Sequence, residues 1–284
     1  MLAFRPIRRL NKRDMIQPKL VPPRGILHTP VEPAGPGYGR YWPGEALAPF
    51  VEHFWTVAWD VAEPEIAEVL PHPSVHLVLE AGNSRVAGVP KGRFTRRLEG
   101  KGRVLGTKFR PGGFRPFLAA PVSSLTGRTI PLDDIFGPAA EGLEEQALAH
   151  ADPVRGFEVV QSFLERLGPK PDPQVDLAAR IAERAATDRE ITRVEHLTTA
   201  FGLGTRTLQR LFAEYVGVSP KWIIQRYRLH EAAERIATGA PIDWPDFALD
   251  LGYADQAHFI RDFRRVVGRS PAEYARRFRG APGG

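Results

Sequence analysis

The segment LQRLFAEYVGVSP, at Leu208–Pro220, recurs without gaps 51 positions later as FIRDFRRVVGRSP, at Phe259–Pro271. The alignment keeps a phenylalanine, a glycine and the final proline in register. Upstream of each copy lies a short amphipathic run that ends in a glycine turn, FGLG in the first case and GYAD in the second. Helix, tight glycine turn and helix is the plan of the helix-turn-helix motif. The repeat therefore predicts two such units, at residues 192–217 and 243–268.

The second helix of each predicted unit has an apolar face and a polar face. The polar faces carry Arg, Gln, His and small residues, namely Arg206, Gln209, Arg210 and Ala213 in the first unit and Ala257, His258, Arg261, Arg264 and Arg265 in the second. Only Asp262 interrupts the second polar face. Guanidinium groups match the edge of guanine, and the Gln amide matches adenine. The pattern predicts that both helices read base pairs in double-stranded DNA.

Between the two units, residues 220–238 read as one amphipathic helix of about 19 residues, roughly 28 Å long. A rigid spacer of this length suits two recognition helices that enter successive major grooves, which lie about 34 Å apart.

Residues 174–280 resemble the DNA-binding domain of the AraC/XylS family of bacterial transcription regulators. The resemblance rests on GLGTRTLQRLFAEYVGVSP, RLHEAAERI and ALDLGYADQAHFIRDFRRVVGRSPAEYARRF. It implies base-reading residues near the start of each recognition helix, at Thr205, Arg206, Gln209, Arg210, Gln256, Ala257, His258 and Arg261. Arg265 joins this set from its place on the polar face. Gly204 stands where the family commonly has a capping serine, so the first recognition helix is expected to begin less firmly.

The residue pattern of 41–168 is typical of a β-rich domain followed by helices. Short β-branched or aromatic runs bounded by Gly, Pro or Asn occur at 53–59, 74–80, 84–89, 92–99 and 102–109. They favour an antiparallel sandwich or a small barrel. Residues 153–167 then predict an amphipathic helix, whose apolar face suits core packing or a dimer contact. The prolines of 169–173 end that helix and mark a linker, because proline lacks a backbone donor.

Residues 41 to about 137 also resemble the N-terminal domain of a poorly characterised subgroup of such regulators, through YWPGEALAPFVEHFW, VLPHPSVHLVLE, VAGVPKGRF and GTKFRPGGFRPFLAAPVSSLTGRTIPLDDIFG. The β-rich residue pattern of this region is similar to that of cupin-like sensor domains, which is an analogy of fold rather than of function. The expected fold is therefore α+β and multidomain, with a β-rich sensor or dimerisation domain at 41–168 and an all-α double helix-turn-helix domain at 174–280.

The first 40 residues hold eight basic and two acidic residues, an excess equal to the net charge of +6 for the whole chain. Many prolines and glycines and no apolar periodicity predict a flexible lead-in, which is either a solvated terminus or a basic arm that follows DNA.

Three residues of the β-rich region are candidate ligand contacts: Trp55, His76 and Arg110. On an extended strand His76 and Glu80 share a face, which also suits a metal site of a cupin-type enzyme. The competing function is therefore an enzyme or metal-binding domain with an auxiliary DNA-binding module. The chain has no cysteine and no dense cluster of His and carboxylates, so we expect no catalytic residues, no metal and no cofactor.

The expected function is sequence-specific transcription regulation, with double-stranded DNA as the main partner. A small-molecule effector, a second copy of the chain in a homodimer and, for an activator, RNA polymerase are the further expected partners. No apolar run approaches the ~18 to 20 residues of a membrane helix, and the start lacks the apolar core of a signal peptide, so the expected compartment is the cytoplasm.

Overall fold

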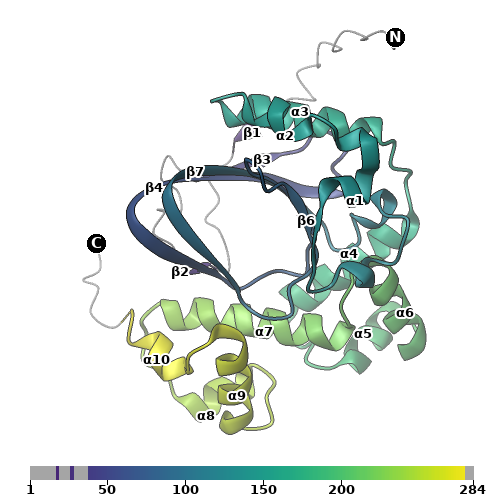
Figure 1. The fold of residues 1–284 in the computed structure, drawn as a ribbon. Helices are drawn as coiled ribbons and strands as arrows, with labels where there is room; N and C mark the ends of the chain where they lie inside the picture. Colours follow the sequence, from purple (N-terminus) through teal and green to yellow (C-terminus); the bar gives the residue numbers. More distant parts are fainter. Residues whose placement is uncertain (1–16, 19–25, 29–37, 279–284) are drawn as a thin grey trace, which may run out of the picture.

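An antiparallel sheet occupies the N-terminal part of the chain in the computed structural model, which describes residues 17–18, 26–28 and 38–278 (Figure 1). Its strands are β1 Gln17–Pro18, β2 Ile26–His28, β3 Tyr38–Trp42, β4 Val51–Val69, β5 His76–Leu79, β6 Arg85–Ala87, β7 Phe94–Phe109 and β8 Thr129–Pro131. The strand order is β1-β3-β4-β7-β5-β6-β8, and β2 pairs with β4. All of these pairs are antiparallel.

The long strands β4 and β7 form a curved two-stranded ribbon. They pair from Val51 with Phe109 to Val69 with Phe94, and their register shifts between Val61 and Glu65. Such an irregularity bends and twists a strand pair. Figure 1 shows the ribbon turning back, so that its far end reaches α7 Pro220–Ala237. We call residues 65–69 and 94–98 the return half of the ribbon.

One face of the sheet packs on the helices that follow it. Side chains alternate between faces along a strand, and Phe54, Leu77 and Leu105 all project into the same core as Phe157 and Leu164 of α3. The helices on this side are η2 Arg115–Phe117, η3 Val122–Leu125, α1 Leu132–Phe136, η4 Gly137–Ala140, α2 Leu143–Leu148 and α3 Pro153–Arg166.

The C-terminal part is entirely helical and contains two cores. Its helices are α4 Pro173–Thr187, α5 Val194–Phe201, α6 Thr205–Tyr215, α7 Pro220–Ala237, α8 Trp244–Asp250, α9 Gln256–Val267 and α10 Pro271–Ala275. The first core joins α4, α5, α6 and the start of α7 and includes Val89 of the N-terminal part. The second joins the end of α7 to α8, α9 and α10 and includes Leu27 and Leu70. N-terminal residues therefore complete both cores.

The expected fold class, a β-rich region followed by an all-α region, is confirmed. The strands form one sheet, so the structure is not a two-sheet sandwich. The runs at 92–99 and 102–109 are one strand, because Gly100, with φ of 53°, continues the chain within the ribbon. Three pieces of the lead-in are also strands: 17–18, 26–28 and 38–40. Strand pairing through backbone groups needs no apolar periodicity, which is why the sequence pattern did not indicate these strands; the rest of the lead-in lies outside the described residues.

Candidate nucleic-acid interface

The first helix-turn-helix unit consists of α5 and α6, joined by a glycine turn. Gly202 ends α5 in the left-handed conformation, with φ of 63°, which glycine adopts without steric cost. Leu208 and Phe212 are fully buried on the inner face of α6. The opposite face exposes the residues expected to read bases: Thr205, Arg206, Gln209 and Arg210. Gly204 precedes α6 without a side-chain cap, as the sequence predicted.

The second unit consists of α8 and α9 and is capped more firmly. The carboxylate of Asp255 accepts a hydrogen bond of 2.7 Å from the backbone amide of His258, which satisfies a free donor in the first turn. Phe259 and Phe263 are fully buried. The predicted base-reading residues lie on the outer face, where Ala257, Arg261 and Arg265 are exposed and Gln256 and His258 are half-buried.

Asp262 organises the outer face of α9, a role that the sequence analysis missed. Its Oδ1 accepts a hydrogen bond of 3.0 Å from Arg265, and its Oδ2 lies 3.8 Å from Nε2 of His258. The ring of Tyr253 meets the His258 ring edge-on, with centroids 5.1 Å apart. The separations of three and four residues, which place side chains together on a helix, were the available signal. Asp262 thus holds one predicted DNA contact, Arg265, by a hydrogen bond and lies near a second, His258.

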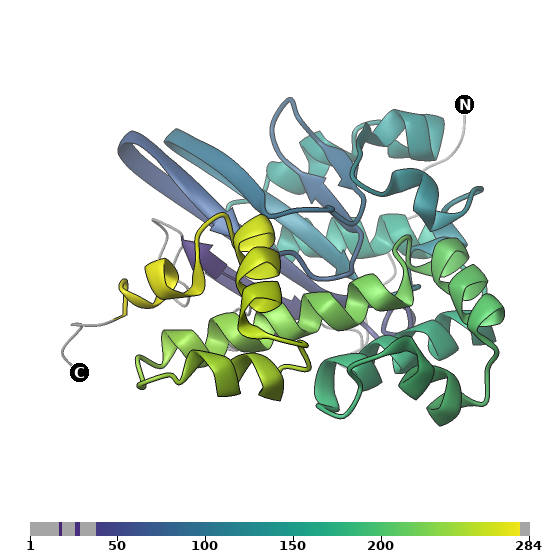
Figure 2. The same ribbon diagram turned by 90° about the horizontal axis from the view of Figure 1, so that it is seen from below.

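Helix α7 and a direct contact between the two helix-turn-helix units fix the position of one unit relative to the other. Figure 2 shows α7 running between the green helices of the first unit and the yellow helices of the second. The buried guanidinium of Arg228 donates to the carbonyl oxygens of Ala185 and Asp188, at 2.9 and 3.0 Å, and so fastens α7 to the end of α4. Gly252 packs against Thr192, where the turn of the second unit touches the start of the first.

Two of the three candidate ligand contacts lie together, on the sheet face opposite the α3 core. The indole nitrogen of Trp55 donates a hydrogen bond of 3.2 Å to Nδ1 of His76. Burial, together with the nearby charges of Lys108 and His53, lowers the pKa of His76 to about 3, so the ring is neutral. The third candidate, Arg110, is exposed and donates to the carbonyl of Ala48, so the structure does not bring it to this pair.

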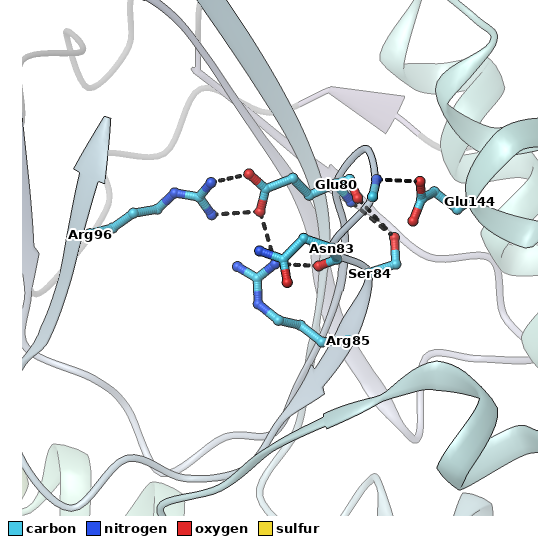
Figure 3. A network of polar contacts seen from close by, with 7 residues as sticks. Glu80, Asn83, Ser84, Arg85, Arg96 and Glu144 are labelled. Carbon is cyan, nitrogen blue, oxygen red and sulfur yellow. Dashed lines mark hydrogen bonds and ion pairs between the residues drawn. The ribbon is translucent and has the colours of Figure 1, made fainter. Parts of the chain in front are cut away.

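Glu80 is the centre of a polar network on the same sheet face (Figure 3). Arg96, from the return half of the ribbon, makes a two-pronged ion pair with its carboxylate, and Arg85 donates to it at 2.8 Å. Burial raises the pKa of Glu80, but hydrogen bonds from the two arginines outweigh it and hold the pKa below its usual value. The network therefore links the return half to β5. Among the described residues no group of three or more metal-ligating side chains is gathered, and Glu80 and His76 have separate partners.

Two family models match separate parts of the chain. Residues 39–131 match a family described as a domain of unknown function, DUF6597, and residues 197–277 match one described as a helix-turn-helix domain. Within the described residues no helix combines the length and apolarity needed to cross a bilayer.

The curated relatives match segments of 71 to 81 residues of this chain. The HTH-type transcriptional regulator ExsA of Pseudomonas aeruginosa is 30% identical over 81 residues, which make up 28% of this chain and 28% of ExsA. Regulatory protein SoxS of Salmonella typhimurium is 41% identical over 71 residues, 25% of this chain and 64% of SoxS. The matched segment thus spans less than two thirds of either relative.

Solved structures give two further similarities. A probable AraC family transcriptional regulator from Rhodopseudomonas palustris is 29% identical, and the match covers 35% of this chain and 94% of that one, with a TM-score of 0.32. ToxT from Vibrio cholerae is 13% identical, with coverage of 80% and 99% and a TM-score of 0.37.

Proposed function

We propose that this protein is a transcription regulator of the AraC/XylS type that binds double-stranded DNA at specific sequences. The match of residues 197–277 to a family described as a helix-turn-helix domain supports the proposal. The observation that carries the proposal is the pair of outer faces on α6 and α9. Helix α6 exposes Arg206 and Arg210, α9 exposes Arg261 and Arg265, and both helices bury a row of apolar residues behind these arginines. The contacts with the N-terminal part lie elsewhere: at the cores, at the C-terminal end of α6, where Arg115 pairs with Glu214, and just after α9.

Base recognition is assigned to the outer faces by hydrogen-bonding chemistry. Arg206 and Arg261 carry bidentate donors that suit the O6 and N7 atoms of guanine, and Gln209 suits adenine. Exposed side chains of this kind reach base edges only when the helix enters the major groove. Helix α7 has 18 residues, about 27 Å at 1.5 Å per residue, which supports recognition helices in successive major grooves.

Selection of bound sequences from random duplexes tests the proposal. We expect one enriched sequence with two conserved elements separated by about one helical turn. Affinity for it should fall steeply as salt increases, because phosphate contacts release counterions. The double variant Arg206→Ala, Arg261→Ala should lose the preference for that sequence, while Lys101→Ala, an exposed cation on the ribbon, should keep it. No enriched sequence with the wild-type chain would refute the proposal.

We also propose that a small molecule controls this binding through the sheet face that carries Trp55 and His76. The supporting observation is the ribbon, since its return half contacts that face through Arg96 and Glu80, and Leu70, the residue that follows β4, belongs to the second core. A ligand that displaces the Arg96–Glu80 pair would act directly on the second unit. Metabolite fractions are tested for a change in affinity for the selected sequence, with Trp55→Leu as the variant that should lose the response. If no fraction changes affinity or thermal stability, the regulator acts without an effector.

Activation of transcription would bring RNA polymerase as a further partner, and a homodimer would double the number of recognition helices on one site. Sedimentation of the wild-type chain with and without the selected duplex measures the number of copies bound.

A further inference from the structure

A cleft of about 300 Å³ lies between the two helix-turn-helix units. Its walls come from the start of α5, from the first turns of α7, from the turn after α8 and from His258 on α9. His258 is one of the residues assigned to base reading, so the cleft opens beside the recognition helix of the second unit. The contact between Gly252 and Thr192 joins the two walls.

Two buried side chains that line the cleft have polar atoms without hydrogen-bond partners. Among the described residues, the hydroxyl of Tyr253, a residue only 7% exposed, has none, and neither does Nε of Arg228, a residue 4% exposed. Burial, together with the nearby charge of Asp262, raises the pKa of Tyr253, so its hydroxyl keeps its proton and can donate. An isolated buried donor is unfavourable unless an acceptor reaches it. Both atoms can therefore take a further hydrogen-bond partner.

The cleft is also rich in cations. Arg193 and Lys221 are exposed at its rim, and no described carboxylate forms an ion pair with either one. Arg228 also lines the cleft, but its guanidinium is paired with Glu231 at 2.8 Å, and His258 lies beside Asp262. Among the described residues, Glu195 is the carboxylate that lines the cleft itself. Buried donors behind a rim of free cations are the arrangement that suits an oxyanion, and phosphate in particular.

We propose that the cleft holds a phosphate of the DNA backbone, between the two segments that α6 and α9 read. Arg193 and Lys221 supply charge at the rim, and Tyr253 donates a hydrogen bond from within. This inference rests on the proposed function and adds to it a contact that carries no sequence information. Such a contact fixes how the two units sit on the duplex and contributes equally at every sequence.

Binding isotherms at several salt concentrations test the proposal, with full-length protein, the selected duplex and a scrambled duplex. Arg193→Ala and Lys221→Ala should each reduce the slope of log affinity against log salt by about 1, and should weaken both duplexes by the same factor. Tyr253→Phe should weaken both duplexes about fivefold to tenfold without changing the slope, because it removes a neutral donor. Lys101→Ala is the matched control for loss of a surface cation.

A methylphosphonate scan locates the phosphate. Replacing single phosphates with neutral methylphosphonates along the selected duplex should reveal one position between the two conserved elements where wild-type affinity falls. The Arg193→Ala, Lys221→Ala double variant should show no further loss at that position. Equal losses in the wild type and the double variant at every position would overturn the proposal, as would salt slopes equal to that of Lys101→Ala.

Inorganic phosphate tests whether the cleft binds a free phosphate ion rather than a phosphate of the DNA backbone. Titration calorimetry with phosphate at constant ionic strength should show no binding at millimolar concentrations, since a backbone phosphate is delivered by the rest of the duplex. Binding that the double variant abolishes, together with unchanged salt slopes on DNA, would assign the cleft to a free anion instead. The wild-type chain can bind the selected duplex while the cleft variants behave like the Lys101→Ala control. That outcome would refute only this inference and leave the proposed function intact.

Discussion

Glu68, on the return half of the ribbon, forms an ion pair with Arg269, directly after the second recognition helix, with 2.5 Å between Oε2 and the guanidinium nitrogen. The other carboxylate oxygen accepts a hydrogen bond of 2.7 Å from Arg93, also on the N-terminal side. Because the side chain of Glu68 is only 10% exposed, this carboxylate depends on its two partners. The sheet therefore holds the end of α9 as well as completing the core behind it.

Removal of this carboxylate charge should loosen the second unit. We expect Glu68→Gln to lower the free energy of unfolding by about 1–2 kcal/mol, because a neutral amide cannot replace two charge-assisted hydrogen bonds. Both arginines are partly exposed and recover water, which limits the loss. Urea unfolding measures the change. Glu63→Gln, at an exposed position of the same strand, is the control, and equal midpoints for the two variants would contradict the prediction.

Arg261 should contribute to specificity. We expect Arg261→Ala to weaken binding to the selected sequence by about 1–3 kcal/mol and to leave binding to scrambled DNA almost unchanged. The reason is that Arg261 is exposed on the outer face of α9, where its guanidinium can reach a base edge. Fluorescence anisotropy with the two duplexes measures both affinities. Equal losses on the two would show that Arg261 contacts phosphate rather than a base.

Stability should depend on pH through His76. Its pKa is lowered to about 3 in the folded chain, so between pH 6.5 and 3 the unfolded chain binds more protons at this residue. The free energy of unfolding therefore has its full value, as far as His76 is concerned, above pH 6.5. It decreases as the pH falls, by up to about 1.4 kcal/mol per pH unit. Burial also lowers the pKa of His53, which acts in the same direction.

Urea unfolding between pH 7 and pH 5 isolates this effect, because carboxylates such as Glu52 are still mostly ionised at pH 5, even in the unfolded chain. His76→Gln should show a shallower decline than the wild type over this range. His150→Gln changes an exposed histidine and should match the wild type. A decline that is identical in all three would exclude His76 as its source.

Gly106 should be intolerant of any side chain. The indole of Trp55 lies across this glycine from the neighbouring strand, in the space that a Cβ atom would occupy. We expect Gly106→Ala to destabilise the fold by about 1–3 kcal/mol, as overpacking does, and to weaken the hydrogen bond from Trp55 to His76. Gly92→Ala adds a methyl group where no atom lies within 4 Å, so it serves as the control. Equal melting temperatures for Gly106→Ala and Gly92→Ala would refute this account.

Several features of the site were predictable because they are local. Apolar spacing within a helix and a glycine that must adopt positive φ depend on neighbouring residues, so the repeat was enough to place α6 and α9 and to separate their inner and outer faces. The contact of Asp262 with Arg265 follows from the same spacing, although a single carboxylate on a basic face looks like an interruption of that face.

Other features depend on strand pairing, which the local pattern does not specify. The runs at 92–99 and 102–109 look like two strands because glycines punctuate them, yet both pair with β4 and form one strand. Arg110 follows the same β7 that passes beside His76, but its side chain turns to Ala48. The pieces at 17–18 and 26–28 are strands because β3 and β4 offer free edges to them.

By itself, the sequence determined that this chain has a β-rich part and two repeated helix-turn-helix units, and which side chains those units present. Periodicity carries that information because burial selects apolar residues at regular intervals along one element. Only the tertiary structure decided that Leu27, Leu70 and Val89 complete the cores of the two units, that Glu68 holds Arg269, and that a cleft with unpartnered donors opens between the units. These contacts join residues distant in sequence, and a long-range contact leaves no periodic trace in the chain.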